Sequence, residues 1–193
     1  LVYAKDFDKF NKGDKISSYF SGILSQENSE YLESYKHFKR LEGLEENHPI
    51  YSQKYQYSLI NLDKFEKAFK YSKKLEKKDL NNFESDLIIG VYYLKNSKYL
   101  EAKKYFEKLR NKGNNNNLPT LLTESLNLWV SFPDIDEIEA INSIKSLSKK
   151  YENLKKIQDV FAHCYFESEE TSLKFEKLIK KQQYELQRYN FFY

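Results

Sequence analysis

The chain has 193 residues, of which 40% are hydrophobic and 32% charged, while Gly and Pro occur only 5 and 3 times. Few residues therefore force a turn, and a globular chain rich in helices is expected. The net charge of +3 is the small difference between 32 basic and 29 acidic residues, so charge alone gives no argument for a nucleic-acid partner. The single cysteine, Cys164, excludes an internal disulfide and a cysteine-based metal site.

The two ends of the chain carry expectations about its context. Val2 and Ala4 place small residues at the alternate positions that signal peptidase accepts. Because the chain starts at Leu1 and contains no Met, we expect a fragment of a longer, bacterial-type protein that is exported to the periplasm, with a cytoplasmic location as the alternative. No run of about 18 apolar residues occurs, so no insertion into a membrane is expected.

Hydrophobic residues recur at helical spacing along the first half of the chain, and short polar stretches interrupt them. Residues 1–13 are expected to be a leader or capping segment, and Asp14 is expected to cap the first helix. Pro49 suits the first turn of another helix, because an N–H group at that position would have no partner within the helix. The predicted helices of this half cover residues 14–25, 30–42, 49–61, 64–77, 82–95 and 98–109.

The second half of the chain begins with a polar insertion at 114–117. A leucine-rich helix with Trp129 follows, and Asp134 with Glu137 is expected to form a capping box for the next helix. Apolar spacing then predicts one more pair of helices and a last helix whose partner is missing. The first predicted helix of this half covers residues 119–132 and the last begins at about residue 183. The helices between them carry apolar residues at 140–147, 157–165 and 173–179.

The helices form pairs that repeat along the chain. When the sequence is shifted by 34 residues, small and apolar positions coincide, which is typical of a helical-repeat protein. The coinciding positions are Ala68 with Ala102, Tyr71 with Tyr105, Leu75 with Leu109 and, after two shifts, Gly22 with Gly90. We expect one repeat domain over residues 14–193, with units at 15–48, 49–82, 83–116, 118–150 and 152–182 and an incomplete helix at 183–193.

The predicted helix pair over residues 82–109 carries small and large residues in a set order. Gly90 and Tyr93 follow each other on its first helix, and Ala102 and Phe106 on its second. In this order the pair resembles the tetratricopeptide repeat family. The resemblance implies an all-α chain folded as a right-handed α-solenoid of about five antiparallel helix pairs. The residues that it marks as architectural are Gly22, Ala68, Gly90, Tyr93, Ala102 and Phe106.

Two helices approach closely only where one side chain is small, so Gly90 is expected to face Ala102 with aromatic residues around the contact. The second unit departs from this pattern, because Gln56 stands where the small residue belongs and Ser72 replaces the aromatic residue. We expect this unit to be packed more loosely or to be filled in a different way.

No constellation of catalytic or metal-binding residues emerges from the sequence. His37, His48 and His163 have no spacing that would make a metal-binding helix face. His163 and Cys164 are adjacent, so on a helix their side chains point about 100° apart and do not form a nucleophile pair. We therefore expect no metal, no cofactor and no enzymatic activity.

The resemblance implies that the first helix of each pair lines a concave binding surface. The residues expected there are mostly apolar or aromatic, instead of the Lys, Arg and Asn clamp by which some members of the family hold carboxylates. We expect this surface to bind an apolar or amphipathic segment of a partner protein or peptide, unless other parts of a longer protein cover it. The expected binding residues are Tyr19, Ile23, Gln53, Tyr57, Leu87, Val91 and Leu94.

Two other functions compete with this interpretation. A single-stranded RNA reader would need basic residues on the inner helices, but the lysines of 70–78 lie on a second helix and are mixed with Glu, so no nucleic-acid partner is expected. Self-assembly is the other alternative, because Tyr184, Leu186, Phe191 and Phe192 would expose an apolar end of the solenoid and favour a homo-oligomer.

Overall fold

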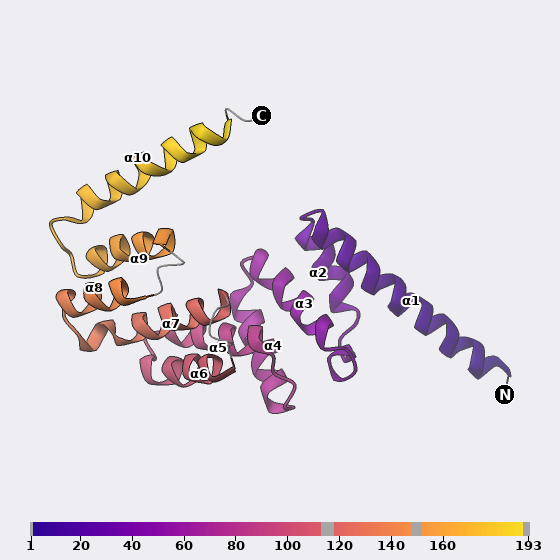
Figure 1. Cartoon of the computed structure of the whole chain (residues 1–193). Coiled ribbons are helices and arrows are strands. Elements are labelled where there is room, and N and C mark those ends of the chain that lie inside the picture. Colours follow the sequence, from indigo (N-terminus) through magenta and orange to yellow (C-terminus); the bar gives the residue numbers. More distant parts are fainter. Residues whose placement is uncertain (1, 113–117, 148–151, 191–193) are drawn as a thin grey trace. The chain divides into compact units, whose positions relative to one another are not determined.

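The computed structural model describes residues 2–112, 118–147 and 152–190, without the side chains of 2–12, 111–112, 118–119, 121 and 181–190. Every regular element in these ranges is helical, which confirms the predicted all-α class (Figure 1). The chain divides into two compact units, Leu1–Leu109 and Arg110–Tyr193. Each unit is described by itself.

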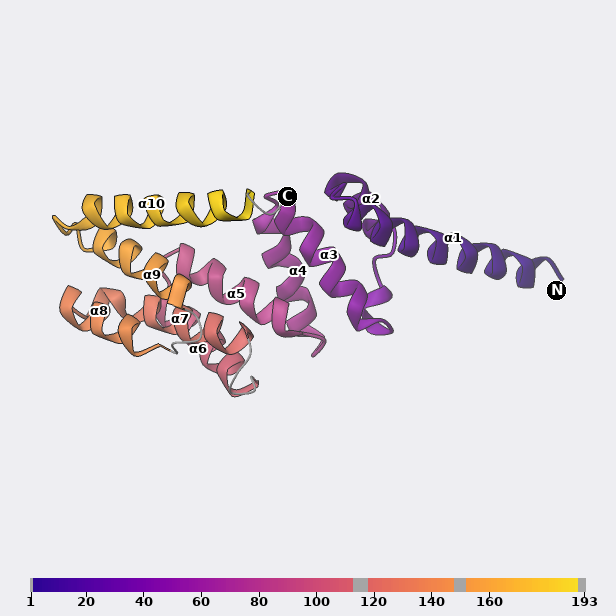
Figure 2. The same cartoon turned by 45° about the horizontal axis from the view of Figure 1, so that its top comes forward.

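The first unit is a series of helices in which each of α1 to α4 packs against the next, and α6 meets α5 where Phe106 lies against Gly90 (Figures 1 and 2). The odd-numbered helices also contact one another: α1 with α3 and α3 with α5. A short 3-10 helix, η1 (Leu44–Glu46), follows α2. The helices are α1 (Val2–Glu27), α2 (Tyr31–Lys39), α3 (Pro49–Asn61), α4 (Phe65–Lys77), α5 (Phe83–Lys95) and α6 (Tyr99–Lys112), the last of which runs past Leu109.

Helix α1 begins at Val2, so the expected cap at Asp14 is wrong and the segment expected to precede the first helix belongs to it. No proline lies in this stretch. Gly13 alone lowers helix stability by only about 1 kcal/mol relative to alanine, which does not stop a helix. The bounds of α3 agree with the prediction, since Pro49 is its first residue.

The turns within the helix pairs repeat with the period found in the sequence. Ser29, Asp63 and Ser97 follow one another at intervals of 34 residues, and all three have left-handed backbones with φ of 61°, 54° and 56°. After each of them, the next backbone N–H donates to the carbonyl group five residues earlier, at 2.7, 2.9 and 2.9 Å. This closure satisfies carbonyl groups at the end of the preceding helix. The 34-residue repeat is therefore present in the backbone as well as in the side chains.

Close contacts between paired helices occur at two equivalent glycines. A Cβ atom added to Gly22 would lie 2.7 Å from Cε1 of Phe38, and one added to Gly90 would lie 2.4 Å from Cε1 of Phe106. Phe106 is thus the residue nearest to Gly90, where the sequence led us to expect Ala102. The aromatic ring fills the space that glycine leaves, and Ala102 is fully buried.

In the second helix pair, the sizes of the two side chains at these positions are exchanged. Gln56 occupies the glycine position and is 1% exposed, while Ser72 occupies the phenylalanine position and is fully buried. Nε2 of Gln56 donates to Oγ of Ser72 at 2.8 Å. The long side chain therefore comes from the first helix of this pair and the short one from the second. The second helix pair is therefore filled in a different way, which is one of the two outcomes expected from the sequence.

The second unit surrounds a core made by Phe132, Ala140, Ile141, Ile144 and Ala162. Trp129 packs against Phe132, with ring centroids 4.4 Å apart. Its helices are α7 (Leu118–Ser131), the 3-10 helix η2 (Phe132–Asp134), α8 (Glu137–Ser146), α9 (Glu152–Tyr165) and α10 (Thr171–Asn190).

Two boundary predictions in this unit are wrong. Asp136, and not Asp134, caps α8, because its Oδ1 accepts from the backbone N–H of Glu139 at 2.8 Å, whereas Asp134 ends η2. Helix α10 continues through residue 183, where a separate helix was predicted, since no helix-breaking residue interrupts its sequence. The apolar side chains expected at the end of the chain lie outside the described side chains; they are Tyr184, Leu186, Phe191 and Phe192.

Within the described residues, no helix has both the length and the apolar character needed to cross a membrane.

Candidate functional site

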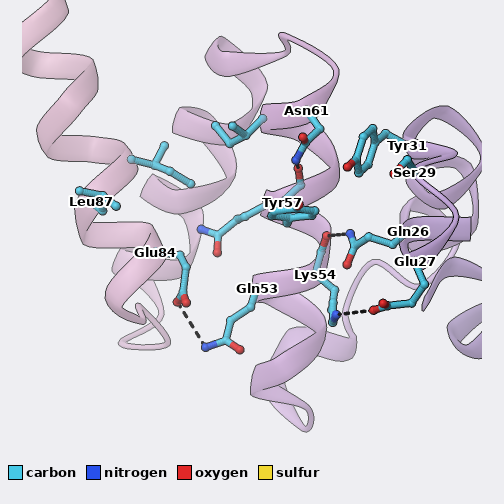
Figure 3. A pocket seen from close by; sticks show the side chains of 13 residues that line it. Gln26, Glu27, Ser29, Tyr31, Gln53, Lys54, Tyr57, Asn61, Glu84 and Leu87 are labelled. Carbon is cyan, nitrogen blue, oxygen red and sulfur yellow. Dashed lines mark hydrogen bonds and ion pairs between the residues drawn. The ribbon is translucent and has the colours of Figure 1, made fainter. Parts of the chain in front are cut away.

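A groove of about 600 Å³ lies within the first unit, on its odd-numbered helices (Figure 3). Its lining comes from the end of α1, from α3 and from the first half of α5, together with Ser29 and Tyr31 at the start of the second helix. Because α1 contacts α3 and α3 contacts α5, successive helix pairs place these faces next to one another. The groove is therefore a product of the repeat.

Buried amide side chains join the three helices beneath the groove. Nε2 of Gln26 in α1 donates to the backbone carbonyl of Lys54 and to Oγ of Ser58 in α3, both at 2.9 Å. Nε2 of Gln56 in α3 donates to Oγ of Ser85 in α5, at 2.8 Å. Buried polar groups in such networks orient their neighbours, since each lost bond would leave an unpaired group. The spacing of α1, α3 and α5 is thus set by side chains that also line or underlie the groove.

The apolar part of the groove has Tyr57 and Ile60 of α3 at its centre, with 51% and 38% of their surfaces exposed. Leu87 and Ile88 of α5 add a half-buried and a buried side chain. The Tyr31 ring meets the Tyr57 ring edge to face, with centroids 5.9 Å apart. The hydrogen bond with Tyr31 raises the pKa of the Tyr57 hydroxyl above its usual value.

The polar part of the groove carries carboxylates on both sides of α3 (Figure 3). Nε2 of Gln53 donates to Oε2 of Glu84 at 3.3 Å. On the other side, Nζ of Lys54 lies 3.7 Å from Oε1 of Glu27. An apolar centre between these polar groups suits a ligand with both apolar and polar side chains.

The structure brings together three of the residues predicted to bind, Gln53, Tyr57 and Leu87. The other predicted residues lie elsewhere. Tyr19 and Ile23 pack against the buried cluster of Phe38, Leu41 and Tyr51, and the Tyr19 ring centroid is 6.2 Å from that of Phe38. Val91 and Leu94 are half-buried on α5 and are not part of the lining.

Sequence reasoning missed the polar residues Gln26, Glu27 and Glu84, which line the groove. The first two were assigned to a break between helices, but α1 continues to Glu27. The 34-residue shift contained the signal that could have found them, because it aligns Gln26 with Ile60 and Glu27 with Asn61, which also line the groove.

The three histidines occupy separate places. His37 lines a polar pocket of about 440 Å³ between α1 and α2, and the His48 ring lies 4.8 Å from that of Tyr19. In the second unit, Nδ1 of the buried His163 lies 2.7 Å from Oε1 of Glu137, which links α9 to α8. In the described part of the chain, no group of three or more His, Cys, Asp and Glu residues is arranged to hold a metal ion.

A scan against protein-family models, a search of curated proteins and a search of solved structures each found no match to this chain. The candidate site is therefore interpreted from its own geometry and chemistry.

Proposed function

We propose that this chain is a tetratricopeptide-like solenoid of helix pairs that acts as a protein-interaction module, without catalysis of its own. Its ligand is an apolar or amphipathic segment of a partner protein, bound in the groove over α1, α3 and α5. The observation that carries the proposal is the groove itself, in which Tyr57 and Ile60 are exposed between polar rims.

The exposed side chains of the groove favour binding of a peptide over binding of a small charged ligand. Tyr57 offers a large ring with few rotatable bonds and a hydroxyl group, the combination that recurs among residues dominating protein interfaces. The apolar neighbours Ile60 and Leu87 would lose contact with water when a ligand covers them, which supplies the driving force. A partner helix or extended segment would meet them along the groove.

The tetratricopeptide-like part of the proposal rests on repetition. The turns at Ser29, Asp63 and Ser97 share one backbone conformation and one hydrogen-bond pattern. Gly22 with Phe38 and Gly90 with Phe106 share one close contact. Units that repeat in this way stack into a curved array whose inner helices present a continuous surface.

Selection from a display library of short random peptides, with the whole chain as bait, tests the binding site. Peptides recovered on the wild-type chain are measured by fluorescence anisotropy against a variant with Tyr57→Ala and Leu87→Ser. We expect a loss of affinity of about tenfold or more, because both changes remove apolar contact area from the groove.

The matched control is Leu100→Ser on α6, since Leu100 is 78% exposed and lies outside the groove. It should leave the affinity unchanged, and circular dichroism should report the same helix content for all variants. Peptides that bind the groove variant as tightly as the wild type would refute the site. Single-stranded RNA binding that falls steeply with salt, in the absence of peptide binding, would favour the nucleic-acid alternative instead.

A further inference from the structure

We propose that the groove selects an arginine side chain within the apolar segment that it binds. This inference deepens the proposed function and rests on it. It follows from the amide and carboxylate oxygen atoms of the groove, which accept hydrogen bonds, and from the position of an exposed aromatic ring among carboxylates.

Three amide side chains at the groove each donate an N–H group to a fixed acceptor. Gln26 donates to the carbonyl of Lys54, Gln53 to the carboxylate of Glu84 and Asn61 to the carbonyl of Tyr57, at 2.9, 3.3 and 2.9 Å. Each of these partners can only accept a hydrogen bond, so the orientation of the three amides is settled by their partners. Their oxygen atoms consequently turn away from these bonds.

Amide oxygen atoms at and beneath the groove can accept hydrogen bonds. Within the described residues, Oε1 of Gln26 and Oε1 of Gln56 are buried and receive no hydrogen bond. The oxygen atoms of Gln53 and Asn61 are acceptors at the groove, because the hydrogen bonds to Glu84 and to the Tyr57 carbonyl use only the amide nitrogens. Buried carbonyl dipoles of this kind make the local potential negative, and the more accessible oxygens can bind a donor directly. The groove therefore favours a ligand that brings several N–H groups.

The charged groups of the groove point to the same ligand. Glu27 and Glu84 contribute two carboxylates, and Lys54 contributes one ammonium group that lies near Glu27. The Glu84 carboxylate accepts from the neutral amide of Gln53 at 3.3 Å. One unit of negative charge thus remains, and it is complementary to one cationic side chain of a ligand.

Arginine fits this site better than lysine. Its guanidinium group holds five N–H donors in one plane and binds carboxylate and carbonyl oxygens together. The same plane can stack on the exposed ring of Tyr57, which lies between Glu84 and Glu27 in Figure 3 and is 51% exposed. Lysine offers one ammonium group without a plane to stack.

The first test is a series of synthetic peptides built from one peptide that the wild-type chain selects, with arginine, lysine, citrulline or glutamate at the same position. Citrulline keeps the shape of arginine but removes the charge. We expect the citrulline peptide to bind about tenfold more weakly than the arginine peptide. The lysine peptide should have an affinity between these two, and the glutamate peptide should bind most weakly. Equal affinities for arginine and citrulline would overturn the arginine proposal and leave the groove as an apolar peptide site.

The second test uses variants with opposite expected signs. Glu84→Gln should weaken the arginine peptide about twofold to fivefold and leave the citrulline peptide unchanged, since exposed ion pairs contribute modestly. Lys54→Gln should strengthen the arginine peptide, because it releases Glu27 from its own cation. Glu101→Gln on α6, outside the groove, is the matched control. Damage to the fold cannot explain the expected gain in affinity. Weaker binding of the arginine peptide to Lys54→Gln would contradict the inference.

The selection itself separates the two proposals. Recovered peptides that require Tyr57 but show no enrichment of arginine over glutamate would retain the proposed function and reject the arginine preference. Failure to recover any peptide that requires Tyr57 would reject both.

Discussion

Among single residues, Gly90 determines how closely α5 and α6 approach. A Cβ atom there would lie 2.4 Å from Cε1 of Phe106, whose side chain is fully buried. We predict that Gly90→Leu lowers the free energy of unfolding by about 3 kcal/mol, the upper range for overpacking of a core. Denaturant unfolding followed by circular dichroism measures this change.

Gly13 supplies the matched control for that prediction. It also lies within a helix, but an added Cβ atom would have nothing within 4 Å. Gly13→Leu should therefore leave stability unchanged or raise it by up to about 1 kcal/mol, because leucine favours the helix.

Combining Gly90→Leu with Phe106→Ala should lower the free energy of unfolding by less than the sum of the single changes. Additive costs would show that the two residues do not share one space.

Among the elements, η1 is held to α4 by a buried carboxylate. Oε1 of Glu45 lies 3.1 Å from Nζ of Lys74 and 3.8 Å from Nζ of Lys78, and Oε2 accepts from the backbone N–H of Gly43 at 2.7 Å. Burial by itself raises the pKa of the Glu45 carboxyl, but its hydrogen bonds and the neighbouring ammonium group outweigh burial and hold this pKa below its usual value. The folded state therefore prefers the ionised carboxylate.

The sign of the resulting pH dependence follows from linkage. A carboxyl with a lowered pKa stabilises the fold above its unfolded pKa of about 4.3, and this contribution is lost as the pH falls through the folded pKa. We predict that the wild-type chain loses more stability between pH 6 and about pH 3 than Glu45→Gln does. Glu42→Gln is the control, because Glu42 also contacts Lys74 but its side chain is 66% exposed. Parallel pH profiles for wild type and Glu45→Gln would contradict the assignment.

For the molecule as a whole, the division into two units predicts unfolding in more than one step. Trp129 is the only tryptophan and belongs to the second unit, where it packs against Phe132. Its fluorescence therefore reports on Arg110–Tyr193, whereas far-UV circular dichroism reports on all helices. We predict that Gly90→Leu shifts the dichroism transition and leaves the Trp129 fluorescence midpoint in place. Equal shifts of both signals would mean that the chain unfolds as one cooperative body.

Much of the helical framework could be predicted because its signals are local. The apolar spacing and the proline at position 49 located α3, and the breaks between predicted helices contain Ser29, Asp63 and Ser97, where the equivalent turns lie. Helix ends without such markers were predicted less well. Asp134 and Asp136 both offer a capping side chain, and only the backbone path through η2 decides between them.

The candidate site was likewise predicted only in part. The sequence by itself determined that the chain is all-α, that its first half repeats every 34 residues and that Gln53, Tyr57 and Leu87 lie on the first helices of their pairs, because period and spacing are properties of one segment. Only the tertiary structure decided which residues meet across helices. That Gly90 faces Phe106, that Glu84 joins Gln53 and that Tyr19 is drawn into a core depend on how helices cross, which no single segment encodes.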